Sequence, residues 1–170
     1  AKAQALGDAM IAALSEDDDA ARAETLAGVS AETPQGAAIL AFMTAGAQAE
    51  AADAALAAQT LQAVSGSADV PLIYRQVAAF KALTLQSDTM DRDARRAGFD
   101  ALAIPGVRLR LLAEEQLALL DIEAGDTDAA LERFQMIIDD AEATAGLQRR
   151  ALQAMVALGG APEVAGIANE

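Results

Sequence analysis

Alanine constrains this chain more than any other residue, because it fills 46 of the 170 positions. Alanine is the strongest helix former and is depleted in β-strands. Its short side chain also lets neighbouring helices approach closely, and aromatic residues make up only 3% of the sequence. No six-residue window alternates β-branched or aromatic residues with polar ones, so the sequence predicts no strand. We therefore expect an all-α protein of tightly packed helices.

The rest of the composition excludes several classes of function. The chain has neither cysteine nor histidine, which removes disulfides, Ser-His-Asp and Cys-His catalysis in their usual forms, and histidine-containing metal sites. Its formal net charge of −14 repels nucleic acid and anionic lipid. No stretch approaches the roughly 20 apolar residues of a membrane span. Residues 1–6 have the pattern of a helix interior without a cap, so we expect a fragment whose N-terminal part was removed.

Glycine, proline and polar clusters divide the sequence into nine predicted helices joined by short connections. Gly46 is expected to end the third helix, and Pro105-Gly106 the sixth. We find no linker long enough to separate two domains, so we expect one domain over residues 1–158 and a weakly structured tail over 159–170. The predicted helices span about residues 1–14, 19–28, 34–46, 49–64, 71–84, 91–103, 108–124, 127–142 and 146–158.

Asp-Ala-Ala triplets, once with arginine in the third place, recur at near-regular spacing along the chain. They begin at Asp19, Asp53, Asp93 and Asp128, which are 34, 40 and 35 residues apart, each near the start of the second helix of a predicted pair. A period of 34 residues is typical of the tetratricopeptide repeat. The spacing therefore predicts a right-handed tetratricopeptide-like solenoid of about nine antiparallel helices, as four hairpins and a closing helix.

Residues 117–134 (LALLDIEAGDTDAALERF) resemble the tetratricopeptide consensus. Ala130 falls at the small position of the second helix and Phe134 at its aromatic position, where the small residue allows a close crossing that the ring fills. The sequence departs from the consensus at Glu114, which replaces a tryptophan, and at Asp121, which replaces a tyrosine.

A longer resemblance covers essentially the whole chain. The segments PLIYR (71–75), PGVRLRLLAEEQ (105–116), LQRRA (147–151) and ALGG (157–160) are similar to the tetratricopeptide-like domain of the ancillary SecYEG translocon subunit in its alphaproteobacterial form. This resemblance implies an N-terminal membrane helix that the chain lacks, a periplasmic repeat domain, and association with the Sec translocon and periplasmic chaperones. The family also includes a cell-division coordinator, so the biological role stays open.

The acidic clusters do not have the spacing of a catalytic or metal site. Asp17-Asp18-Asp19 lacks the alternating ligands, glycine and terminal glutamate of a calcium loop. Adjacent carboxylates such as Glu114 and Glu115 diverge by about 100° on a helix, so they cannot flank a substrate as glycosidase carboxylates do. We expect no enzyme, no cofactor and no metal site.

The basic residues are concentrated in the second half of the chain, where ten of the twelve lie after residue 70. Arg92, Arg95 and Arg96 lie within about one helical turn, and Arg108 and Arg110 follow the next corner. Two interpretations stay open: a docking patch for an anionic or acidic peptide, or ion pairs within the protein to nearby residues such as Asp91, Asp93, Asp100 and Glu114. The second arrangement is the more common one.

The expected function is a non-catalytic protein–protein interaction domain of a membrane-anchored protein that assists Sec-dependent export or envelope assembly. By the resemblance, the partners would be the Sec translocon, periplasmic chaperones or client proteins, at the periplasmic face of the bacterial inner membrane. The alternative is a soluble periplasmic repeat scaffold of the cell-division or envelope machinery. The candidate partner-binding residues are Phe42, Tyr74, Gln76, Arg92, Arg95, Arg96, Arg108 and Arg110.

Overall fold

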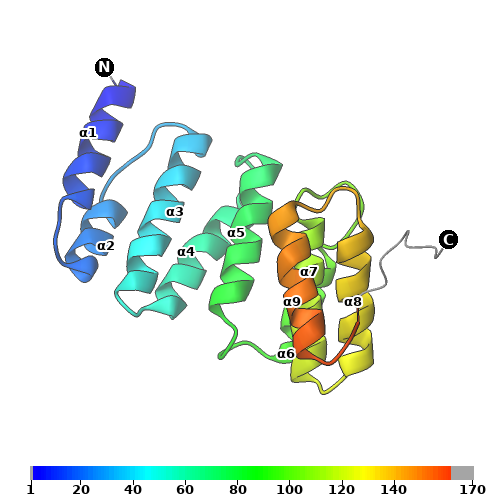
Figure 1. The fold of residues 1–170 in the computed structure, drawn as a ribbon. Coiled ribbons are helices and arrows are strands. Elements are labelled where there is room, and N and C mark those ends of the chain that lie inside the picture. Colours follow the sequence, from blue (N-terminus) through cyan, green and yellow to red (C-terminus); the bar gives the residue numbers. More distant parts are fainter. Residues whose placement is uncertain (1, 162–170) are drawn as a thin grey trace. The chain divides into compact units, whose positions relative to one another are not determined.

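The computed structural model describes residues 2–161, with side chains from residue 4 onward. Over this range the chain forms nine α-helices and no strand, so the all-α prediction is confirmed (Figure 1). None of the helices in the described range is both long and apolar enough to span a bilayer. The helices are α1 (Lys2–Leu14), α2 (Asp19–Ala27), α3 (Pro34–Glu50), α4 (Ala54–Gly66), α5 (Leu72–Leu85), α6 (Arg92–Asp100), α7 (Arg110–Glu123), α8 (Thr127–Asp139) and α9 (Ala145–Ala157).

Aspartate side chains cap every second helix of the chain. An aspartate carboxylate accepts a hydrogen bond from a free backbone N–H in the first turn and meets the positive end of the helix dipole. The caps of α2, α4, α6 and α8 are Asp18, Asp53, Asp91 and Asp126. The predicted Asp-Ala signal therefore marks these helix starts, although it coincides with the capping residue only at Asp53.

The predicted boundary at Gly46 is wrong. Helix α3 continues through this glycine to Glu50, and α4 begins only at Ala54. Glycine in a helix interior costs about 1 kcal/mol relative to alanine. The residues around it, Thr44, Ala45, Ala47 and Gln48, are buried on the protein side of α3, and this packing outweighs the cost. The turn falls instead at Ala52, which has a φ of 63°.

Other predicted boundaries also differ from the structure. Helix α6 ends at Asp100 rather than near residue 103, and α8 ends at Asp139 rather than near residue 142. A turn follows α6 directly, and after α8 the extended residue Asp140 breaks the helix before a turn. Apolar residues continue past Asp100, and this continuation led the sequence prediction to extend the helix.

Contacts between Cα atoms group the chain into two compact units, Ala1–Met90 and Asp91–Glu170, called unit 1 and unit 2 below. In unit 1 each of the helices from α1 to α5 contacts the next, and α3 also contacts α5. In unit 2 the helices from α6 to α9 likewise contact one another in sequence order. The prediction of a single domain over residues 1–158 stays a prediction. The predicted tail lies mainly at 162–170, outside the described residues.

Alanine makes the core of unit 1. Ala38, Ala57 and Ala78, from α3, α4 and α5, are fully buried in one cluster with Leu61. A second cluster is centred on the fully buried Leu26. Small side chains at these positions let the helix backbones approach closely, as the composition predicts.

The core of unit 2 is built around large residues set beside small ones. Phe134 is fully buried in one cluster with Ala118, Ala130 and Ile137, so the small and aromatic positions predicted in residues 117–134 do share a core. Leu147 of α9 joins the same cluster. Helices α7, α8 and α9 are therefore held by one apolar core, which fixes the surface described next.

Candidate functional site

The predicted partner-binding residues of unit 1 form an aromatic contact between two helices. Phe42 of α3 and Tyr74 of α5 have ring centroids 6.4 Å apart at an interplanar angle of 41°. Both side chains are partly buried and pack against the core cluster of unit 1. Gln76 is half-buried, two residues further along α5. The two rings therefore contribute to helix packing and expose only part of their surface.

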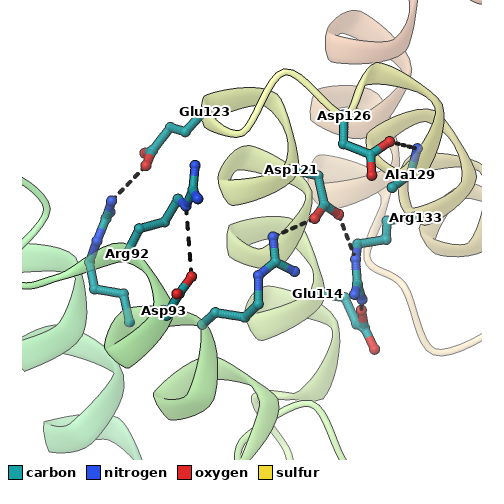
Figure 2. A network of polar contacts seen from close by, with 10 residues as sticks. Arg92, Asp93, Glu114, Asp121, Glu123, Asp126, Ala129 and Arg133 are labelled. Carbon is teal, nitrogen blue, oxygen red and sulfur yellow. Dashed lines mark hydrogen bonds and ion pairs between the residues drawn. The ribbon is translucent and has the colours of Figure 1, made fainter.

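The predicted arginines of α6 form ion pairs, and two of them reach α7 (Figure 2). Arg95 Nη2 lies 2.6 Å from Glu123 Oε2, and the arginine side chain is only 9% exposed. Arg96 Nη2 lies 2.5 Å from Asp121 Oδ1. Arg92 Nε lies 3.9 Å from Asp93 Oδ1 on its own helix. Arg95 and Arg96 are thus engaged within unit 2, with partners about 25 residues away that local sequence does not reveal.

A carboxylate on α7 lies at the centre of this network. Asp121, which is 5% exposed, also accepts a hydrogen bond of 2.8 Å from Arg133 Nε of α8. Arg133 Nη1 in turn donates to Glu114 Oε2 at 2.5 Å (Figure 2). Burial alone would lower the pKa of Arg133, but the hydrogen bonds to Asp121 and Glu114 outweigh it and raise that pKa. The network joins α6, α7 and α8.

The remaining two predicted arginines, Arg108 and Arg110, line a hollow of about 550 Å³ in unit 2. The hollow lies where α7 and α9 begin, and we call it the basic hollow. Its lining includes three arginines, one glutamate and four apolar side chains: Arg108, Arg110, Arg150, Glu142, Val107, Leu111, Leu112 and Leu147. It therefore offers cations beside an apolar wall.

Arg110 is held firmly in place at this hollow. Its Nη2 lies 2.8 Å from Asp140 Oδ2 and 2.8 Å from Glu142 Oε2, in the segment between α8 and α9. Hydrogen bonds to Glu142 and to Asp140 raise the pKa of Arg110. The hydrogen bond from Arg110, helped by the backbone N–H of Glu142, lowers the pKa of Asp140. These contacts fix the start of α7 to the connection before α9.

The other two arginines differ in their partners. Arg150 donates from Nε and Nη2 to the two carboxylate oxygens of Glu115, both at 2.8 Å, and these hydrogen bonds raise its pKa. Arg108 is exposed, and no ion pair joins it to another residue of the described range. Of the three arginines of the basic hollow, Arg108 is therefore the one whose charge is available to a ligand.

Sequence reasoning found Arg108 and Arg110 but missed Arg150 and the apolar wall. The corner at Pro105-Gly106 was the local signal for the first two, because the chain turns there before α7 begins. Arg150 and Leu147 come about 40 residues later, on α9. Only the packing of α9 in the unit 2 core brings them to the same hollow.

A larger hollow, of about 640 Å³, lies in unit 1 beside α1 and the connection from α2 to α3. Its lining includes Leu6, Ala9 and Val29 but no arginine or lysine among the residues whose side chains the structure describes. Size alone would favour it as a site. The basic hollow is the better candidate because it combines a wall of aliphatic side chains with a few convergent polar groups, as ligand sites do.

Comparisons with models of protein families, with curated proteins and with solved structures find no match for this chain. Among the described residues, no three acidic side chains gather as metal ligands would. What the protein does is therefore inferred from the residues of its own surface.

Proposed function

We propose that the protein is a non-catalytic protein-binding domain that holds a short segment of a partner in the basic hollow of unit 2. The observation that carries this proposal is the position of Arg108, an exposed arginine without an ion pair in the described range, next to the apolar Val107 and Leu112. Recognition sites usually combine a charged group that orients the ligand with aliphatic surface that supplies contact area.

The surroundings of Arg108 suit binding because they are rigid. Arg110 and Arg150 are each fixed by carboxylates on neighbouring segments, and Leu147 belongs to the buried core. A preformed site loses less conformational entropy when a ligand binds than a mobile one does. The hollow is open and small, so we expect affinities in the micromolar range or weaker.

The architecture proposed for this function is a right-handed tetratricopeptide-like solenoid of antiparallel helix pairs. Three observations support it. Helices contact their sequence neighbours within each unit, and aspartates cap the second helix of each pair. Ala130 and Phe134, the small and aromatic positions of residues 117–134, share a core. Such arrays present extended surfaces to protein partners.

For the biological role we propose a membrane-anchored periplasmic protein that assists Sec-dependent export or envelope assembly. The support is the resemblance of residues 71–75, 105–116, 147–151 and 157–160 to the ancillary SecYEG translocon subunit. Two of these segments carry residues of the basic hollow, Arg108 and Arg110 in one and Leu147 and Arg150 in the other.

Site-specific photo-crosslinking in the full-length protein tests this function. A photoreactive phenylalanine replaces Val107, which lines the hollow next to Arg108 in the sequence, and a matched variant carries it at Glu132, an exposed position of α8 that does not line the hollow. We expect adducts with Sec translocon subunits, periplasmic chaperones or exported clients at position 107 and not at 132. Adducts with division proteins alone would support the scaffold alternative, and equal labelling at both positions would refute a binding site at this hollow.

A further inference from the structure

We infer that the basic hollow recognises a short peptide segment in which a carboxylate stands next to aliphatic side chains, and that Glu142 occupies the place of this carboxylate when no partner is bound. This inference rests on the proposed function and specifies the chemistry of the partner. It is carried by the partners of Arg110, by the unpaired Arg108 and by the aliphatic side chains that line the same hollow.

Glu142 makes a contact with Arg110 that the fold does not need. One nitrogen, Arg110 Nη2, donates to both Asp140 and Glu142 at 2.8 Å. The Asp140 side chain is 19% exposed, whereas that of Glu142 is 79% exposed. Asp140 alone keeps Arg110 paired and in place. Because an exposed ion pair contributes little to stability, the Glu142 carboxylate leaves at little cost.

The vacated position lies in the same hollow as Arg108. Glu142, Arg108 and Arg110 all line it. When a partner's carboxylate replaces Glu142 as the acceptor for Arg110, it enters the hollow that the unpaired guanidinium of Arg108 also lines. Arginine donates through a planar fork that fits a carboxylate, which gives the contact direction as well as charge.

The apolar wall determines what must accompany the carboxylate. Val107, Leu112 and Leu147 contribute aliphatic surface beside the arginines. A volume of about 550 Å³ is within the range of sites that enclose a small ligand, so the hollow accommodates a few residues of an extended segment. An acidic residue flanked by leucine-like residues satisfies both features, whereas a highly charged polyanion is repelled by a chain of net charge −14.

Fluorescence anisotropy with synthetic hexapeptides tests the inference on the purified chain. The probe carries one glutamate between two leucines in an otherwise alanine and serine sequence, with both ends blocked. Its twin carries glutamine in place of the glutamate. We expect the glutamate peptide to bind more tightly than the glutamine twin by up to about fivefold, the value of one exposed charge pair. Equal binding, or no binding of the glutamate peptide at millimolar concentration, would overturn the inference.

Two substitutions with matched controls locate the contact. Arg108→Ala should weaken binding of the glutamate peptide by up to about fivefold, whereas Arg149→Ala, at an exposed arginine of α9 outside the hollow, should not change it. Glu142→Gln should tighten binding two- to threefold, because the competing carboxylate is gone. Glu132→Gln, at an exposed glutamate of α8, should have no effect.

The gain on Glu142→Gln is the decisive result, since removal of an acidic residue with a purely structural role does not improve binding of one peptide selectively. No gain, or the same gain with Glu132→Gln, would refute the competition. A phosphoserine twin that binds much more tightly than the glutamate peptide would overturn the assignment in favour of a phosphorylated segment. If these peptide tests fail while crosslinks to export components persist at position 107, the proposed function stands and only the chemistry assigned to the partner is wrong.

Discussion

Arg133 of α8 and Asp121 of α7 are joined by a hydrogen bond of 2.8 Å between Nε and Oδ2. Arg96 of α6 donates to the other oxygen of the same carboxylate. Arg133 also donates to Glu114 of α7. Two carboxylates of α7 therefore belong to a single ion-pair network with arginines of α6 and α8, and these charged contacts link the three helices.

This arrangement predicts a large loss of stability for Asp121→Ala. The substitution leaves Arg96 and Arg133 without a shared, buried acceptor. Removal of one partner of a buried pair costs about 3–5 kcal/mol, and since both arginines are partly exposed we expect about 2–3 kcal/mol. Urea denaturation followed by circular dichroism at 222 nm measures this loss in the free energy of unfolding. Glu132→Ala, an exposed position of the neighbouring helix α8, should change stability by less than about 0.5 kcal/mol. Equal effects of the two substitutions would show that the network is not important for stability.

How much of the fold the sequence predicts depends on how local the determining interaction is. The capping aspartates act on N–H groups two or three residues away, so the starts of α2, α4, α6 and α8 are readable from the sequence. The end of α3 is not, because the packing of Ala45, Ala47 and their neighbours decides whether the helix continues past Gly46. Composition predicts the helical class, and only tertiary contacts determine this boundary.

Gly46→Ala should stabilise the protein by up to about 1 kcal/mol. The glycine lies in the interior of α3, and an added Cβ would meet no atom within 4 Å. Alanine reduces the entropy of the unfolded chain and has the higher helix propensity. Gly106→Ala is the control for which we expect the opposite sign. Gly106 has a φ of 86°, which favours glycine, so this substitution should destabilise the protein by about 1 kcal/mol. Thermal denaturation of both variants checks the signs, and a destabilising Gly46→Ala would contradict the helix described here.

The candidate site was only half predictable for a similar reason. A corner of the chain places Arg108 and Arg110 two residues apart, and both line the same hollow. Whether their charges are free depends on acidic residues about 30 positions later, because Asp140 and Glu142 pair with Arg110. The sequence shows where arginines gather, but the packing of α7 with α8 and α9 decides which of them is unpaired.

Asp140 predicts a dependence of stability on acid pH. The hydrogen bond from Arg110 lowers its pKa in the folded protein, so the folded state holds the ionised carboxylate more strongly than the unfolded chain does. Its contribution is therefore present above about pH 4, the ordinary aspartate pKa, and is lost as the pH falls through the lowered value. The difference in the free energy of unfolding between the parent and Asp140→Asn should shrink as the pH falls from 6 to 2.5. Asp100→Asn, at an exposed aspartate of α6, is the matched control variant. If the difference in the free energy of unfolding between the parent and Asp140→Asn does not change with pH, ionisation of Asp140 does not contribute to stability.

Arg108 and Arg110 should separate binding from stability, although they are two residues apart and line one hollow. Arg108→Ala removes an exposed charge without an ion pair in the described range, so we expect an unchanged melting temperature and weaker binding of the glutamate hexapeptide. Arg110→Ala removes the partner of Asp140 and Glu142 and should lower the melting temperature measurably as well as weaken binding.

Raising the salt concentration from about 50 to 500 mM should weaken peptide binding to the parent, because exposed charge pairs are screened within a Debye length of about 10 Å or less. That salt dependence should be smaller for Arg108→Ala, since one of the screened charges is already absent. Binding that does not change with salt, or a melting temperature that falls equally in both variants, would show that the two arginines hold the helices together and leave no charge for a partner.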